Sequence, residues 1–371
     1  MKRERYVPLD SLRGLAAWLV VITHVLSVYP VLYGHSPSGH PAVVFFFVLS
    51  GFVLSLPFFR GPVAYGPYLL RRLCRIWLPY VAAMLLATVC AVGFYPQPVP
   101  ELSQWANHAQ RWPTGWEFIE HLMLVGSFPN GTYNPVVWSL VHEMRVSLFF
   151  PLLFWVVSRL TWIQSLALAL SLSLLATALR HASEYFGVVT DYPLTLHYSA
   201  LFIPGILLAR HAPWLISLYA RIPTWTRWLG FLGSVMLFTH SLWLWPGSVL
   251  QRIPVSADGL VALSVVYFIT VALAPSRMSL ILQHPWLVRF GQMSYSIYLC
   301  HAVILLSLVH SFWSPALLPW LLLLVFPLTF ALSALAYAWV ELPAIRLGSW
   351  LMAHWPFSPS TLIKLCSPLT R

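Results

Sequence analysis

Charged residues are scarce in this chain of 371 residues, because Asp, Glu, Lys and Arg together make up only 8% of it. A soluble domain carries about 25% of them. So little charge cannot cover a water-facing surface of this size, which excludes a soluble globular protein. Intrinsic disorder is excluded as well, because hydrophobic residues make up 59% of the sequence. Most of the surface must therefore face lipid.

Cysteine is also scarce, and the four cysteines lie far apart, at Cys74, Cys90, Cys300 and Cys366. Their spacing matches no metal-binding or redox motif, and most of them lie in or beside apolar runs. This excludes a disulfide scaffold. We interpret the cysteines as small hydrophobic residues and predict no metal site.

Acidic residues are fewer than basic ones, with 10 Asp and Glu against 21 Lys and Arg. In a soluble protein this excess would suggest nucleic-acid binding. In a membrane protein it has another meaning, because cytoplasmic loops accumulate Lys and Arg. We therefore expect no nucleic-acid partner.

Long hydrophobic runs dominate what is present. At ~20 residues per membrane-spanning helix, they provide for about ten spans. The sequence thus predicts an all-α polytopic protein of the cytoplasmic (inner) membrane. The expected spans cover residues 12–31, 42–59, 76–96, 135–158, 162–179, 196–209, 228–245, 257–274, 290–312 and 317–340.

The distribution of Lys and Arg predicts the topology. With a cytoplasmic N-terminus, the extracytoplasmic loops contain only Arg111, Arg180 and Arg252, and nearly all other basic residues fall on the cytoplasmic side. This pattern satisfies the positive-inside rule and favours an even number of spans with both termini in the cytoplasm. We expect residues 348–371 to form a tail along the inner interface.

The longest extracytoplasmic loop, at about 98–134, is rich in tryptophan, histidine and glutamate. One interpretation is an interfacial segment anchored by aromatic side chains, which is common in membrane proteins and which we favour. The other is a lid that stacks on sugar rings.

Ionisable residues inside the membrane are the main functional signal, because they are expensive in lipid and usually face a working site. The sequence places them at two depths. The first layer lies near the cytoplasmic ends of the helices and contains Arg13, Arg72, Arg75 and Glu341. The second layer lies about three turns deeper and contains His24, His142, Glu143, Arg145 and His301.

Arg13 and His24 are eleven positions apart, which is about 20° beyond three full helical turns. Both therefore lie on one helix face, about 16 Å apart along the axis. Arg72 and Arg75 also share a face, and guanidinium groups bind phosphate oxygens well. Charge alone does not separate that role from ordinary positive-inside topology.

Glu143 and Arg145 point in different directions on their helix, so each needs a partner on another helix. We expect Arg145 to neutralise an acid across the bundle. On the helix at 290–312, Ser294, Tyr298 and His301 form a polar stripe.

Several short motifs resemble, in order, those of the acyltransferase 3 family of membrane acyltransferases. The resemblance covers residues 6–347, which we take as one transmembrane domain. After Glu143 the chain continues Met144-Arg145-Val146-Ser147, where the family more often has aromatic residues. The motifs are Leu9-Asp10-Ser11-Leu12-Arg13-Gly14 followed by His24, Phe45-Phe46-Phe47-Val48-Leu49-Ser50-Gly51-Phe52, Arg72-Leu73-Cys74-Arg75, Trp138-Ser139-Leu140 with Glu143, Ser294-Tyr295-Ser296-Ile297-Tyr298-Leu299-Cys300-His301, and Val340-Glu341-Leu342-Pro343.

The resemblance implies transfer of an acyl group, acetyl above all, from cytoplasmic acyl-CoA to a hydroxyl of an extracytoplasmic glycan or lipid-linked sugar. Acyl-CoA is then a co-substrate, and no permanently bound cofactor is expected. Membrane lipid is the other expected partner, and the oligomeric state stays open. The implied roles are catalysis by His24, Glu143 and His301, donor binding by Arg13, Arg72 and Arg75, and structural ion pairing by Asp10, Arg145 and Glu341.

Within this hypothesis His24 is a general base or a transient acyl relay. Glu143 orients His24 or the acceptor, His301 donates to the oxyanion, and Glu341 pairs with Arg13 or another arginine of the first layer. The competing class is a proton-coupled transporter or flippase, which also contains buried ionisable residues. The sequence contains no internal inverted repeat of the kind such carriers often have.

Overall fold

The computed structural model describes residues 6–31, 39–94, 98–107, 115–129, 131, 134–240 and 254–354. Every regular element in these ranges is a helix, which confirms the all-α fold class. Eight of the described helices are long and apolar enough to cross a membrane, so the chain is a multi-pass membrane protein.

The first half of the described chain contains seven elements. They are α1 (Val7–Ser27), α2 (His40–Arg60), α3 (Tyr65–Arg72), the π-helix η1 (Leu73–Trp77), α4 (Leu78–Phe94), α5 (Gly115–Met123) and α6 (Trp138–Arg159).

The second half continues with ten elements. They are α7 (Trp162–Tyr185), α8 (Tyr192–Arg221), α9 (Thr224–Phe238), α12 (Pro254–Leu273), α13 (Arg277–Leu282), α14 (Pro285–Gln292), α15 (Ser294–Ser311), α16 (Leu318–Ala336), the π-helix η2 (Tyr337–Glu341) and α17 (Leu342–Ala353).

A helix overlaps each predicted span, but two of these helices fall short of spanning length in the described residues. The helix α9 has 15 residues, and the apolar part of α12 covers Ala257–Leu273. The predicted residues 241–245 and the part of the tail after residue 354 lie outside the described residues. The first residues of the predicted tail belong to α17, and its place along the inner interface stays a prediction.

One predicted boundary is wrong in a way that affects the site. The span predicted at 76–96 begins at Tyr65, because α3, η1 and α4 form one continuous helical segment, Tyr65–Phe94. Because α3 is amphipathic, its turns lack the continuous apolar run by which the sequence marks the later turns of this segment as a span. Arg72 and Arg75 thus lie well inside a helix and not at its start.

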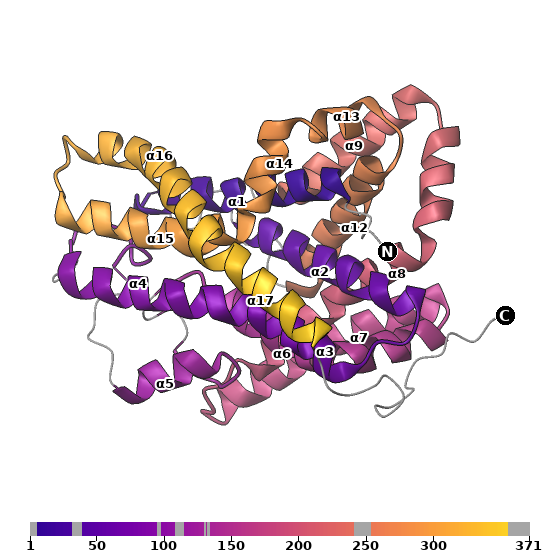
Figure 1. The fold of residues 1–371 in the computed structure, drawn as a ribbon, viewed down its shortest axis with the longest axis horizontal. Coiled ribbons are helices and arrows are strands. Elements are labelled where there is room, and N and C mark those ends of the chain that lie inside the picture. Colours follow the sequence, from indigo (N-terminus) through magenta and orange to yellow (C-terminus); the bar gives the residue numbers. More distant parts are fainter. Residues whose placement is uncertain are drawn as a thin grey trace.

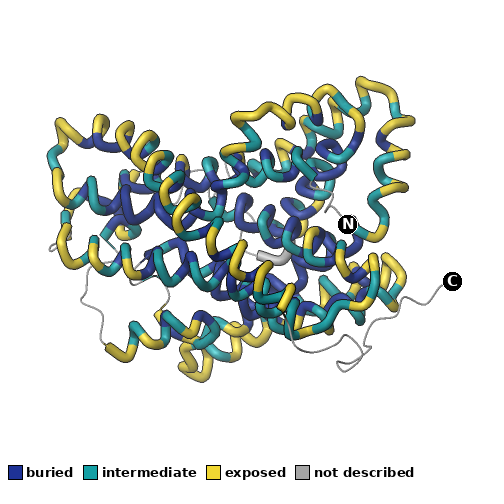
Figure 2. Tube along the Cα trace, viewed as in Figure 1, coloured by how far each residue is buried: buried dark blue, intermediate teal, exposed yellow. Residues whose placement is uncertain are grey.

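Most long helices run side by side across the molecule in Figure 1, where α1 begins at the right and ends toward the left. We call the end where α1 begins the N-terminal end, and the end where α1 finishes the far end. Figure 2 shows buried residues concentrated in the centre of the bundle and exposed ones on its outer helices. Those outer helices expose large apolar side chains, such as Leu166, Leu170 and Leu174 on α7, which suits contact with lipid.

Glycines allow two of the closest helix crossings. A Cβ on Gly51 of α2 would collide with the backbone of Phe202 on α8, and one on Gly205 would collide with the backbone at Val48. In the same way Gly291 of α14 lies against the backbone carbonyl of Asp10 on α1. Small residues at crossings let membrane helices approach closely and position the side chains beside them.

Candidate active site

Two histidines of the second predicted layer meet in the interior. The Nδ1 of His24 on α1 lies 2.8 Å from the Nε2 of His301 on α15. The two rings are nearly parallel, with an interplanar angle of 7° and centroids 5.1 Å apart. The sequence predicted only that the two histidines lie at one depth, and the structure shows that they contact each other directly.

The hydrogen bonds determine which nitrogen of each ring carries the proton. The Nδ1 of His301 lies 3.0 Å from the carbonyl oxygen of Ile297, and a carbonyl only accepts. His301 therefore carries its proton on Nδ1, and its Nε2 accepts a hydrogen bond from the Nδ1–H of His24. Within the described residues no hydrogen bond engages the Nε2 of His24, so its lone pair is free, which is the state that a general base requires.

A tryptophan that sequence reasoning did not assign to the site covers His24. The ring of Trp105 stacks on the imidazole of His24 with centroids 4.6 Å apart and an interplanar angle of 10°. Trp105 belongs to the loop predicted at 98–134. The only signal for it in the sequence was the richness of that loop in tryptophan.

The segment that carries Trp105 is tied to the far end of the bundle. Ser103 donates from its backbone to Val28 and from its hydroxyl to the carbonyl of Ser27, at 3.1 and 2.6 Å. The Nε2 of His310 on α15 lies 3.0 Å from the carbonyl oxygen of Ala106. These bonds hold the tryptophan between α1 and α15, so it is part of the wall around His24.

Glu143 does not contact His24, so of its two expected roles the direct orientation of His24 is wrong, and orientation of the acceptor stays a prediction. Its carboxylate accepts a bond of 2.7 Å from Arg72, which also donates to Ser147 at 3.1 Å. The hydroxyl of Ser50 donates to the same carboxylate at 3.0 Å. The two predicted layers therefore meet at this ion pair, because the helix of Arg72 begins a full 11 residues before the predicted boundary.

Arg13 and Arg75 differ from Arg72 in having no such partner. In the described part of the chain, no hydrogen bond or ion pair within 4.0 Å engages either guanidinium. Glu341 accepts a bond of 2.7 Å from Ser296 and interacts with Arg75 and Arg13 at longer range. Glu341 thus lies among the arginines of the first layer without a direct ion pair to Arg13.

Both π-helices carry a charged motif residue of this layer. The helix η1 contains Arg75 and packs against α17, and η2 ends at Glu341 and packs against α4. A π-turn changes the direction of the side chains that follow it, and such turns occur often at functional sites.

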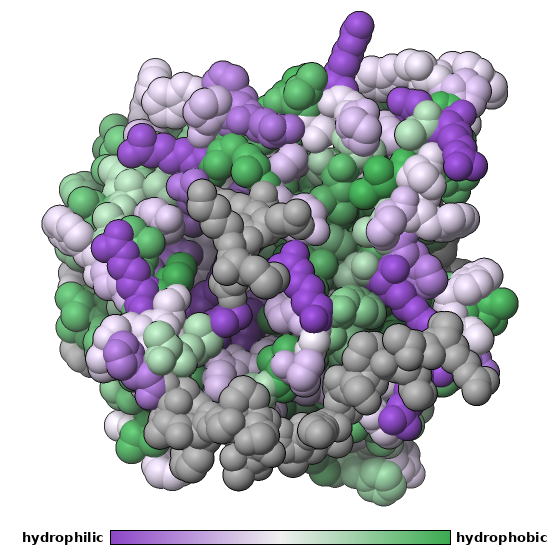
Figure 3. Space-filling view, turned by 45° about the vertical axis from the view of Figure 1, so that its right-hand side comes forward, coloured by the Kyte–Doolittle hydropathy of each residue, from purple (hydrophilic) through white to green (hydrophobic). Residues whose placement is uncertain are grey.

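A cavity of about 630 Å³ lies beside this region, lined by Val7 of α1, Arg289 and Gln292 of α14, and Tyr337 and Ala338 of η2. It lies at the N-terminal end of the bundle. Figure 3 brings that side of the molecule forward and shows hydrophilic residues around a hollow left of centre.

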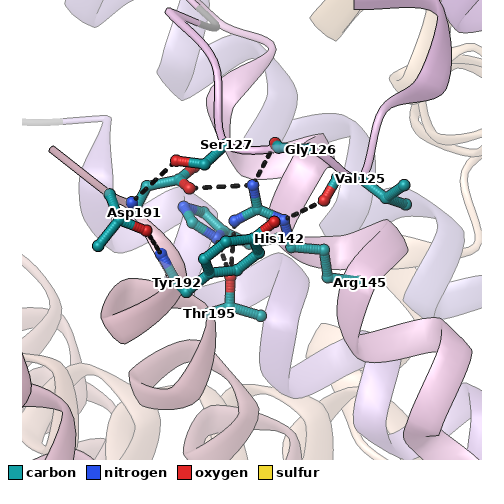
Figure 4. Close-up of polar contacts among 9 residues, drawn as sticks. Val125, Gly126, Ser127, His142, Arg145, Asp191, Tyr192 and Thr195 are labelled. Atoms are coloured by element: carbon teal, nitrogen blue, oxygen red, sulfur yellow. Dashed lines mark hydrogen bonds and ion pairs between the residues drawn. The ribbon is translucent and has the colours of Figure 1, made fainter. Parts of the chain in front are cut away.

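Arg145 forms an extended polar cluster nearer the far end (Figure 4). Its guanidinium lies 2.9 Å from the carboxylate of Asp191, and it also donates to Thr195 at 2.9 Å. Further bonds go to the carbonyl oxygens of Val125 and Gly126. The acid across the bundle that we expected for Arg145 is thus Asp191, in the turn before α8.

Hydrogen bonds attach the segment 115–129 to the bundle. Trp77 donates to the carbonyl of Leu122 at 2.6 Å, and Tyr80 donates to that of His121 at 3.0 Å. Burial lowers the pKa of His121 to about 4, so this ring is neutral at physiological pH. Trp116 is exposed, and Trp112 lies outside the described residues.

Comparison with known proteins agrees with this arrangement. The sequence model of the acyltransferase 3 family, described as an acyltransferase domain, matches residues 7–338. Because the match spans most of the chain, the chain belongs to this family. It is thus a multi-pass membrane protein of an acyltransferase family.

Individual relatives carry related names. Two proteins of Staphylococcus aureus, from strains COL and MRSA252 and each named "Putative O-acetyltransferase", are 22% identical over 94% and 96% of this chain. The chain spans only 58% and 60% of their lengths. Nodulation protein 10 of Rhizobium leguminosarum bv. viciae is 24% identical, over 93% of this chain and 95% of that protein. No solved structure matches the chain.

Proposed function

We propose that the protein is an O-acyltransferase of the cytoplasmic membrane that moves an acyl group, acetyl above all, from acyl-CoA to a hydroxyl of a glycan or lipid-linked sugar. The observation that carries the proposal is the free Nε2 of His24, which the bond to His301 leaves as the basic nitrogen. The names of the Staphylococcus relatives support O-acetylation.

In the proposed reaction, the Nε2 of His24 removes the proton of the acceptor hydroxyl. The hydroxyl oxygen attacks the thioester carbonyl, a C–O bond forms, and the C–S bond breaks. The sulfur leaves with the electron pair and takes the proton back from His24, so that the thiol is released and the histidine is neutral again. The ester is formed without net uptake or release of a proton.

The N-terminal end is the proposed donor side, in agreement with the positive-inside topology. Arg13 and Arg75 are the proposed phosphate ligands, because no hydrogen bond or ion pair within 4.0 Å engages them in the described chain, where Glu341 interacts with both only at longer range. Their guanidinium groups suit phosphate oxygens. The pantetheine arm is comparable in length with the axial distance of about 16 Å from Arg13 to His24.

Arg72 and Glu143 receive a different role from the one that the sequence suggested. Since they bind each other, we assign them to holding α3 and α6 together beside the site. We likewise assign His301 to orienting His24, because both of its ring nitrogens are engaged.

The test uses purified protein in lipid vesicles with radiolabelled acetyl-CoA and a panel of methyl hexosides, and it measures CoA release and labelled ester. His24→Ala is expected to lower the transfer rate by ~10²–10⁴-fold, the usual contribution of a general base. His181→Ala, at a side chain that is 75% exposed on α7, is the matched control and should keep the wild-type rate. Wild-type transfer by the His24 variant would refute the proposal, and a much larger loss would favour a covalent acyl relay.

A further inference from the structure

A second histidine cluster lies at the far end of the bundle, and the proposed reaction does not use it. The Nε2 of His40, the first residue of α2, lies 2.8 Å from one carboxylate oxygen of Asp258 on α12. The other oxygen lies 2.9 Å from the Nε2 of His197 on α8. The Nδ1 of His197 lies 3.1 Å from the hydroxyl of Ser173 on α7. Four helices thus supply one polar chain in an apolar region.

The carboxylate determines the protonation of both rings. The side chain of Asp258 is 3% exposed, and it is stabilised by accepting a hydrogen bond from each Nε2–H. The Nδ1 of His40 has no hydrogen-bond partner in the described residues. The side chain of His40 is 38% exposed, and its Nδ1 is not among the buried, unpartnered side-chain atoms of the described residues, so this nitrogen is accessible. No group in the described chain has the arrangement of a metal site.

An aromatic surface lies next to this free nitrogen. The ring of Trp138 is parallel to that of His40, with an interplanar angle of 10° and centroids 6.3 Å apart. Neither ring is fully buried. An apolar flat surface beside a directed polar group is the combination that binds a sugar ring, which has apolar C–H faces and hydroxyl edges.

This corner is close to the candidate reaction centre. Gly39, which precedes His40, packs against Val20 and Thr23 of α1, and Thr23 is the neighbour of His24. On the other side, Ser139, which follows Trp138, is 2.7 Å from the hydroxyl of Tyr298. The ring of Tyr298 lies 6.0 Å from that of His301.

We propose that His40 and Trp138 form the acceptor site, in which Trp138 packs against a sugar ring and the Nδ1 of His40 forms a hydrogen bond with one of its hydroxyls, which can donate to this nitrogen or accept from it. Asp258 and His197 are positioning residues that fix the tautomer and orientation of His40. As an acceptor site for transfer, the assignment rests on the proposed function, because the bound sugar would present a second hydroxyl to His24.

The alternative is that the chain of four polar residues only holds the helices together. Variants that keep the fold separate the two roles. His40→Gln retains an N–H group for Asp258 but removes the free ring nitrogen, and Trp138→Ala removes the flat surface. Trp116→Ala is the matched control, because that ring is 67% exposed on α5.

The first measurement compares transfer kinetics with acetyl-CoA binding and melting temperature. We expect His40→Gln and Trp138→Ala to raise the KM for methyl hexosides at least about tenfold with little change in kcat, while acetyl-CoA affinity stays at the wild-type value. The melting temperature should stay at the wild-type value in His40→Gln, whereas Trp138→Ala also loses packing against the core and should melt somewhat lower. Trp116→Ala should match the wild type. Unchanged acceptor kinetics in both variants, or a parallel loss of donor binding and thermal stability in His40→Gln, would overturn the proposal.

The second measurement reads binding without acyl transfer. Diethyl pyrocarbonate modifies accessible unprotonated imidazoles, and mass spectrometry reports the modification of His40 in the full-length protein. We expect methyl hexosides or methyl N-acetylhexosaminides to protect His40, and glycerol, which has hydroxyls but no ring, to leave it reactive. Protection by none of the sugars, or equal protection by glycerol, would contradict the proposal. Protection together with inactive wild-type protein would support a sugar site while refuting acyl transfer.

Discussion

The two histidine clusters at the far end differ in what faces the imidazole. His24 faces a second neutral ring, that of His301, whereas His40 faces the buried carboxylate of Asp258. In each case one ring nitrogen is bound, and the other has no hydrogen-bond partner among the residues that the structure describes. A neighbouring carboxylate stabilises a positively charged imidazolium more strongly than a neighbouring neutral imidazole does. The His24 arrangement therefore suits a base that must return its proton, and the His40 arrangement suits a stable binding group.

The largest effect is expected from removing the partner of His24. His301→Leu leaves the Nδ1–H of His24 without an acceptor, so the ring can turn away or change tautomer. We expect the transfer rate to fall about 10²-fold, as for small misplacements of a catalytic group. His301→Gln, whose amide oxygen can accept the same bond, should recover part of the loss. Equal rates for the two variants would show that this hydrogen bond does not orient His24.

A smaller effect is expected from neutralising the partner of His40. In Asp258→Asn the amide replaces one carboxylate oxygen and no longer fixes both histidines. Since a hydrogen bond to a charged group contributes about 1.5–3 kcal/mol, we expect the KM for methyl hexosides to rise about tenfold or somewhat more. Acetyl-CoA binding, followed by calorimetry, should not change. A weaker donor affinity with an unaltered acceptor KM would reverse the assignment of the two clusters.

The smallest effect is expected from Trp105, which stacks on His24. Aromatic stacking contributes about 0.5–1.5 kcal/mol, so Trp105→Ala should slow transfer by about twofold to tenfold, and Trp105→Phe by less. Initial rates at saturating acetyl-CoA measure the change. If Trp105→Ala instead raises only the acceptor KM, the tryptophan belongs to the acceptor path and not to the positioning of the base.

Sequence reasoning predicted the residues of the first cluster better than their contacts. The eleven-residue spacing of Arg13 and His24 places them on one face of a single helix, and this follows from helix geometry alone. The contact of His24 with His301 joins the first and ninth predicted spans. No local periodicity reports how two such distant helices are rotated relative to one another.

The partner of Glu143 shows the same limit. Its need for a partner on another helix followed from the sequence, but Arg72 was assigned to a different depth because the start of its helix was predicted too late. The second cluster was missed entirely. His40, His197 and Asp258 lie near the predicted ends of three separate spans, where single polar residues are common and carry no motif.

Composition and order along the chain determined the class of this protein: scarce charge and long apolar runs require a helical bundle in lipid, and the ordered motifs identify the family. These properties depend on local physics, on burial of apolar surface and on the hydrogen bonding of each helix within itself. Only the tertiary structure decided which of the few charges meet, which imidazole nitrogen is free, and which tryptophan covers the base. Those depend on helix rotation, π-turns and glycine crossings, where shifts of a few ångströms make or break a hydrogen bond.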